Sequence, residues 1–247
     1  MQTHSVIDPK YRRPLLVLGL LAASTFLSLG LLVSRWVVGG RFAYPFLVWN
    51  LFLAWVPFGF AVALCLTHAG GNPRPAKMVV LGVLWLLFFP NAPYLLTDFV
   101  HLGQEHNGPW WCDLMLTIGF AWNGLLLGLL SLFLVQRVVT ERVGSGWGRA
   151  TSAATLILGS FGISLGRFGR FNSWDVVSNP VELLADIISQ VLHPMDYPKQ
   201  FAMAVLLCAF LSLAYLTLLA LISLGRDDLQ IKDPGIGGMP GSSLFLR

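Results

Sequence analysis

Two short polar segments in an otherwise apolar chain carry the side chains best suited to chemistry. Asp98 and His101 stand three residues apart in PNAPYLLTDFVHL, residues 90–102. Side chains at that spacing share one face of a helix. A carboxylate beside an imidazole suits a general base with its orienting partner, and also suits metal ligation. We therefore assign Asp98 and His101 to a catalytic role, with a divalent metal ion as an open alternative.

The second segment is GRFGRFNSWD, residues 166–175, in which Arg167 and Arg170 are also three apart. Two guanidinium groups on one face suit a phosphate or carboxylate, because each can donate a bidentate pair of hydrogen bonds. Structural ion pairing of these arginines with Asp98 or Asp175 is an equal alternative. Asp175 joins the catalytic pair in our assignment. The other residues assigned to ligand binding are Asn91, Tyr94, Arg167, Arg170, Asn172 and Trp174.

A metal site would need more than Asp98 and His101, because two ligands do not hold an ion. Four further side chains could supply more ligands, namely Glu105, His106, Asp113 and Asp175. The plainer interpretation is an aspartate that caps a helix and a histidine at the depth of the lipid headgroups. No nucleophile motif is present, so the sequence leaves open whether catalysis occurs. No other cofactor is expected.

The composition indicates the setting of these residues. The chain has 247 residues, of which 55% are hydrophobic and 11% charged, whereas about 25% are charged in soluble domains. This predicts a polytopic membrane protein with lipid as its surrounding partner. The net charge of +4 does not indicate nucleic-acid binding, because the basic residues are scattered between apolar runs.

We predict an all-α fold, a polytopic transmembrane helix bundle of about six spans. Residues 1–13 form a cytoplasmic N-terminal segment, residues 14–224 a single transmembrane domain, and residues 225–247 a flexible cytoplasmic tail. The expected spans are residues 14–33, 44–66, 76–102, 113–135, 151–165 and 201–224.

Pro90 and Pro93 interrupt the third span, and the helix either continues beyond them to Leu102 or breaks near the outer leaflet. We expect Asn91 to bond backbone that the prolines leave without a partner. Asn123, in the fourth span, predicts a hydrogen bond between helices. Gly124 and Gly128 fit the small-xxx-small spacing of closely approaching helices, although chance explains that spacing equally well.

Residues 180–192 predict a short amphipathic helix along the membrane surface, since they are too few and too polar to span. Asn179 is the expected cap and Pro180 the first helical residue. Eleven of the 16 Lys and Arg residues lie on the side of the two termini. The positive-inside rule then places both termini in the cytoplasm and both polar segments on the extracytoplasmic face, where we expect them to meet.

The pair PNAPYLLTDFVHL and GRFGRFNSWD resembles the signature of the bacterial integral membrane proteins grouped as domain of unknown function 1361. The resemblance covers the chain from the second or third span to the sixth. It implies a multi-span protein of the bacterial inner membrane and supplies no activity.

Three functions fit these observations. The first is a site at the extracytoplasmic face that binds or processes an anionic, phosphate-bearing lipid or envelope precursor. The second is a small permease built around the broken third span, although the charged groups gather at one edge. The third is a structural or assembly partner, in which Arg–Asp pairs lock helices together.

Overall fold

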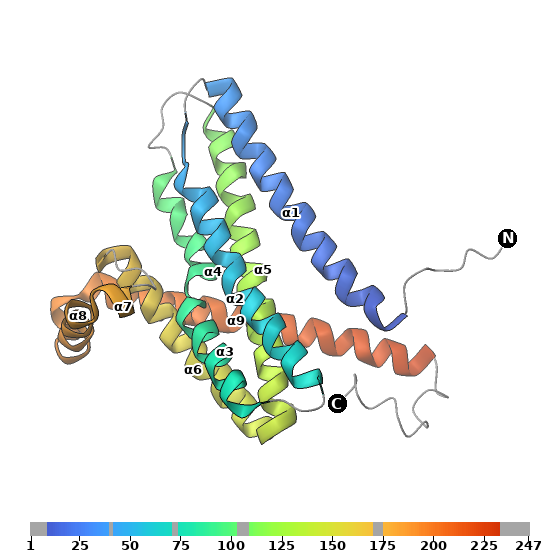
Figure 1. Cartoon of the computed structure of the whole chain (residues 1–247). Coiled ribbons are helices and arrows are strands. Elements are labelled where there is room, and N and C mark those ends of the chain that lie inside the picture. The colour runs from blue at the N-terminus through green and yellow to red at the C-terminus, as the bar shows by residue number, and fades with distance from the viewer. Residues whose placement is uncertain (1–8, 40–41, 71–73, 103–108, 170–174, 233–247) are drawn as a thin grey trace. The chain divides into compact units, whose positions relative to one another are not determined.

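The computed structural model describes residues 9–39, 42–70, 74–102, 109–169 and 175–232. Every regular element in these ranges is helical, which confirms the all-α prediction. The longer helices are α1 (Pro9–Gly39), α2 (Phe46–Ala69), α3 (Pro75–Phe88), α5 (Trp110–Val143), α6 (Ser145–Ser164), α8 (Pro180–Leu192) and α9 (Pro198–Lys232) (Figure 1). The shorter ones are α4 (Asn91–Tyr94), the 3₁₀ helices η1 (Leu95–His101) and η3 (Pro194–Asp196), the π-helix η2 (Leu165–Gly169) and α7 (Asp175–Ser178).

Five helical stretches of the described chain are long and apolar enough to cross a membrane, so this is a multi-pass membrane protein. They are Pro14–Gly39, Phe46–Ala69, Pro75–His101, Trp110–Val143 and Pro198–Leu224. The expected span at residues 151–165 forms α6, which is not among these five. Its buried face consists largely of small and hydroxyl residues, which suits close helix packing. At the other end, α9 continues to Lys232, beyond the predicted start of the tail.

The chain divides into two compact units by internal contacts. The first holds Met1–Phe60 and Val83–Leu130, and the second holds Ala61–Gly82 and Ser131–Arg247. The boundary falls inside α2, α3 and α5. The polar segment at residues 90–102 belongs to the first unit and the segment at residues 166–175 to the second.

The third span is interrupted where the prolines predict. The helix α3 ends at Phe88, and the chain continues through α4 and η1 to His101. Asn91 Nδ2 donates a hydrogen bond to the Phe88 carbonyl oxygen at 3.0 Å, which confirms its expected role at the break. Of the two alternatives for this span, the structure has the helix continuing past the prolines in a tighter 3₁₀ form.

Two glycines of α5 make room for this break. A Cβ atom at Gly124 would overlap the Ala92 carbonyl oxygen, and a Cβ at Gly128 would lie 3.3 Å from Pro93 Cδ. The small-xxx-small spacing of Gly124 and Gly128 therefore marks a close approach of helices and is not accidental. Because α4 packs closely against α5 in this way, the start of η1, which follows α4, is held in place.

Asn123 joins helices within the first unit, as predicted. Its Nδ2 donates to Ser28 Oγ at 2.9 Å and to the Ser24 carbonyl oxygen at 3.2 Å. Thr25 Oγ1 donates to Asn123 Oδ1 at 3.2 Å and accepts from Trp55 Nε1 at 3.2 Å. This network connects α1, α2 and α5.

The helix α8 begins and ends where the amphipathic pattern predicts. Its apolar residues Val181, Leu184, Ile188 and Val191 are exposed, which fits the expected position along a membrane surface. Asn179 precedes Pro180 and occupies the predicted N-cap position, but its side chain makes no capping bond to the backbone and its amide donates to the Glu182 carboxylate instead.

Candidate functional site

The predicted pair Asp98 and His101 lies on η1 in the first unit. A 3₁₀ helix has three residues per turn, so residues three apart are aligned on one face. Asp98 is 2% exposed, and its Oδ2 accepts a hydrogen bond from Asn50 Nδ2 of α2 at 3.0 Å. A carboxylate is therefore buried inside a membrane-spanning segment, with an amide of a neighbouring helix as one partner.

His101 lies at the end of η1, against the start of α2. Its ring packs on the ring of Phe46, with the centroids 4.8 Å apart and the planes at 59°. Its backbone carbonyl oxygen accepts a hydrogen bond from Tyr44 Oη at 3.5 Å, a long contact. The segment just before α2 and the first turns of α2 thus line η1, with Tyr44 and Phe46 at His101 and Asn50 at Asp98.

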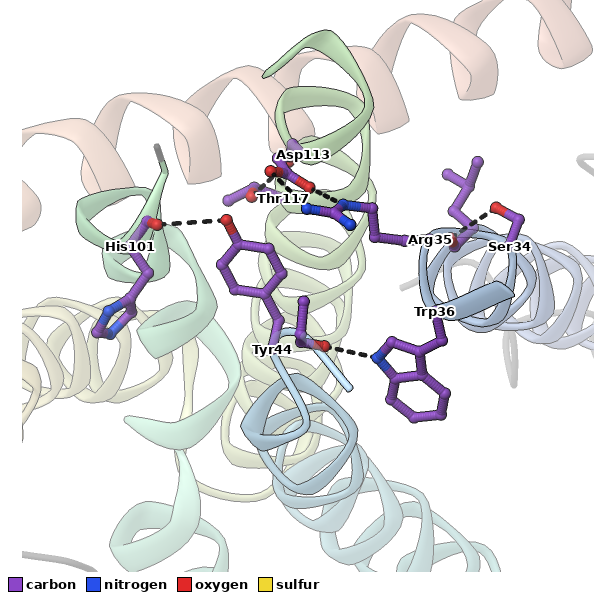
Figure 2. A network of polar contacts seen from close by, with 9 residues as sticks. Ser34, Arg35, Trp36, Tyr44, His101, Asp113 and Thr117 are labelled. Atoms are coloured by element: carbon purple, nitrogen blue, oxygen red, sulfur yellow. Dashed lines mark hydrogen bonds and ion pairs between the residues drawn. The ribbon is translucent and has the colours of Figure 1, made fainter. Parts of the chain in front are cut away.

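Tyr44 has an unusual backbone. Its φ of 53° lies in the left-handed region, which a bulky residue rarely adopts, and Pro45 follows it. The side chain is 5% exposed and extends to η1 (Figure 2). Strained backbone of this kind persists where the surrounding structure holds it, and it is common at functional sites. Trp36 Nε1 supports the segment by donating to the Ala43 carbonyl oxygen at 2.6 Å.

A buried ion pair lies near Tyr44 and connects α1 to α5 (Figure 2). Arg35 Nε donates to Asp113 Oδ1 at 2.6 Å, and Arg35 Nη2 donates to Asp113 Oδ2 at 3.4 Å. The side chains are 4% and 2% exposed. Thr117 Oγ1 donates to the Asp113 carbonyl oxygen at 2.8 Å. The arrangement fixes the end of α1 to the first turn of α5.

Sequence reasoning did not identify Arg35, Tyr44 or Asn50 as part of this region. The first predicted span, residues 14–33, ends before Arg35, although the apolar Val37 and Val38 that follow are consistent with the longer helix observed. Asn50 is a polar amide inside an apolar run, and this contrast could have identified it from the sequence. The conformation of Tyr44 depends on tertiary contacts and leaves no clear trace in the sequence.

The other predicted residues fall into three groups. Asn91 bonds backbone at the proline break, and Tyr94 is half-buried, with its carbonyl oxygen accepting from Thr97 Oγ1 at 2.8 Å. In the second unit Arg167 lies half-buried on η2, and Asp175 begins α7 and accepts from Ser178 Oγ at 2.9 Å. The remaining three, Arg170, Asn172 and Trp174, lie outside the described residues.

The structure brings Asp98 and His101 onto one element, and it places Arg167 and Asp175 in the other unit. The predicted meeting of the two polar segments therefore stays a prediction. The metal alternative also stays a prediction. Within the described part of the chain, no three His, Cys, Asp or Glu side chains gather closely enough to hold an ion.

The comparisons with known proteins give one match. The family described as "Protein of unknown function (DUF1361)" matches residues 49–215, a range that includes both polar segments and η1. No curated protein and no solved structure matches the chain. Because the match covers well over half of the sequence and agrees with the motifs, the chain belongs to the DUF1361 family.

Proposed function

We propose that this protein binds an anionic, phosphate-bearing lipid or envelope precursor at the extracytoplasmic face of the inner membrane, with η1 as the recognising element. Asp98 and His101 are the groups that meet the reactive or hydrogen-bonding part of the ligand. Asn50, Phe46 and Tyr44 position them. The same two side chains are also suited to transform the bound ligand, as a general base and its orienting partner.

The observation that carries the proposal is the burial of Asp98. A carboxylate within a membrane span is unfavourable, and residues of this kind usually serve a ligand, ion or proton. An apolar pair would pack α2 against η1 at least as well as Asn50 with Asp98, since buried charges are weak sources of stability. The presence of a carboxylate at this position therefore supports a role other than packing.

The chemistry of the ligand follows from both polar segments. A carboxylate repels a phosphate, so the part of the ligand that meets Asp98 carries a hydrogen-bond donor such as a hydroxyl group. The phosphate requires guanidinium groups, and Arg167 and Arg170 supply them in the sequence. Arg167 lies on a π-helix, an irregularity found frequently at functional sites.

The orientation follows from charge. Lys and Arg residues are concentrated on the side of the termini, so the positive-inside rule assigns that side to the cytoplasm. The end of η1 then faces the extracytoplasmic side. Labelling of a tag at either terminus from outside intact cells would contradict this orientation.

A structural role is the second candidate, and one observation favours it. The buried pair of Arg35 and Asp113 fastens α1 to α5 with no ligand needed. If η1 served only to complete such a framework, substitution of Asp98 would lower protein abundance and leave lipid binding per folded molecule unchanged.

The test is lipid retention by the purified full chain in mild detergent, measured by native mass spectrometry. One arm offers phosphatidylglycerol and another a polyprenyl phosphate, which separates a bulk lipid from a precursor. Asp98→Ala is compared with Asp196→Ala, an exposed aspartate on η3. We expect Asp98→Ala to reduce retention of one lipid about tenfold, as the loss of a hydrogen bond to a charged group implies. Equal retention by both variants in both arms would overturn the proposal.

A further inference from the structure

Charged side chains are distributed unevenly within the second unit, and the proposed function does not use its basic region. This region comprises the last turns of α2 and α5 and the segments that begin α3 and α6 (Figure 1). Its described residues include one acid, Glu141, and five cations, which are Arg74, Lys77, Arg137, Arg142 and Arg149. The described residues of 167–199 carry two cations, Arg167 and Lys199, and four acids, which are Asp175, Glu182, Asp186 and Asp196. The basic region is therefore the one suited to an anionic partner.

The one acid of the basic region is already engaged within the protein. Arg137 Nε donates to Glu141 Oε1 at 2.8 Å, and His68 Nε2 lies 2.9 Å from Glu141 Oε2. The other four cations are exposed, and no ion pair of the described ranges includes them; they are Arg74, Lys77, Arg142 and Arg149. In the part of the chain that the structure describes, four positive charges thus have no acidic partner.

Exposed apolar side chains beside the cations indicate their depth in the membrane. Val143, 61% exposed, follows Arg142 directly, and Trp147, 65% exposed, precedes Arg149 by two residues. An exposed apolar side chain at the end of a membrane helix contacts lipid, and Trp is enriched where hydrocarbon gives way to water. The phosphate groups of phospholipids lie at that boundary. A lipid headgroup is therefore the anion that these two arginines meet.

The start of α3 has the same arrangement. Lys77 is exposed in its first turn, and Val79, two residues further on, is 64% exposed. Arg74 precedes the first residue of the helix and is also exposed. Cations at the start of α3 and at the turn between α5 and α6 thus share one depth, next to apolar surface that lipid covers.

The turn between α5 and α6 is held closely by its glycines. Gly144 has a φ of 110°, which favours glycine, and its N–H donates to the Thr140 carbonyl oxygen at 3.0 Å. A Cβ atom at Gly148 would overlap the Thr140 side chain, so α6 begins directly against α5. The backbone on which Arg142 and Arg149 stand is therefore preorganised, which lowers the conformational entropy lost on binding.

We propose that this basic region binds the headgroups of anionic phospholipids in the leaflet around it, with Arg142, Trp147 and Arg149 as the main contacts. Each guanidinium can donate two hydrogen bonds to one phosphate, and the Trp147 indole N–H supplies a further donor. Lys77 and Arg74 extend the contact along the start of α3. By the positive-inside rule this leaflet is the cytoplasmic one. The contact does not involve η1, so it is independent of the proposed function.

The test is the stabilisation of the purified full chain by added lipid in detergent, followed as the melting temperature. A ligand that binds the folded state raises this temperature with its concentration, so a titration gives an apparent affinity. Phosphatidylglycerol is compared with phosphatidylcholine of the same acyl chains, and inorganic phosphate is a third arm. We expect the wild type to prefer phosphatidylglycerol. Raising the salt from about 0.05 to 0.5 M should reduce this preference, because exposed charges are screened.

Arg149→Gln is the decisive variant, and Lys199→Gln, which removes an exposed cation at the start of α9, is its matched control. Arg149→Gln should weaken the apparent affinity for phosphatidylglycerol about fivefold and leave that for phosphatidylcholine unchanged. Arg149→Lys keeps the charge and should keep most of the affinity. The proposal would be overturned by an unchanged affinity in Arg149→Gln, by an equal loss in Lys199→Gln, or by stabilisation from inorganic phosphate that matches that from phosphatidylglycerol.

Discussion

The ion pair of Arg35 with Asp113 and the ion pair of Arg137 with Glu141 each join an arginine to a carboxylate, but in different surroundings. Arg35 and Asp113 are 4% and 2% exposed, whereas Arg137 and Glu141 are 30% and 28% exposed. A buried pair loses its hydration on folding and depends on its partner, while an exposed pair keeps much of its water. The buried pair therefore holds α1 and α5 in one arrangement. The exposed pair can change partners at a small cost in free energy.

This difference fits the role proposed for η1. The buried pair lies beside Tyr44, whose strained backbone needs rigid surroundings, and Tyr44 in turn contacts the end of η1 (Figure 2). A rigid region of this kind suits a preorganised site.

The largest effect is expected from removal of one partner of the buried pair. Arg35→Ala leaves Asp113 charged and unpaired in the interior, which should lower the free energy of unfolding by about 3–5 kcal/mol. The measurement is thermal unfolding in detergent together with protein abundance in the membrane. The double variant Arg35→Met with Asp113→Leu removes both charges and should recover most of the loss. A double variant no more stable than Arg35→Ala would show that packing, and not charge, explains the effect.

Close packing behind η1 should produce an intermediate effect. Gly124→Ala places a Cβ atom on the Ala92 carbonyl oxygen, so α4 must move away from α5, at about 1–3 kcal/mol of stability. Gly59→Ala is the matched control within the same unit, because no atom lies within 4 Å of its added Cβ. Alanine is also the better helix former, so the control should be neutral or slightly stabilising. Equal unfolding temperatures for the two variants would mean that α4 has room to adjust.

The sequence predicted the local features of this molecule and missed the pairings between distant segments. Proline chemistry places the break at Pro90, and the amphipathic period gives the bounds of α8, because both depend on neighbouring residues. The three-residue spacing of Asp98 and His101 likewise places both residues on one face of η1. The pair of Arg35 with Asp113 and the bond from Asn50 to Asp98 join segments far apart in the chain, and no local pattern specifies them.

The smallest effect is expected at the exposed ion pair. Arg137 and Glu141 are four residues apart on α5 and partly exposed, a pairing that contributes about 0.3–0.5 kcal/mol. Arg137→Ala should therefore shift the unfolding temperature by no more than about 2 °C, and added salt should shrink the shift further because exposed charges are screened. The same salt titration on Arg35→Ala should leave its large loss nearly unchanged, since buried charges are screened far less. Unfolding temperatures measured from about 0.05 to 0.5 M salt compare the two directly. A salt-independent loss of several degrees in Arg137→Ala would mean that this end of α5 is as rigid as the other.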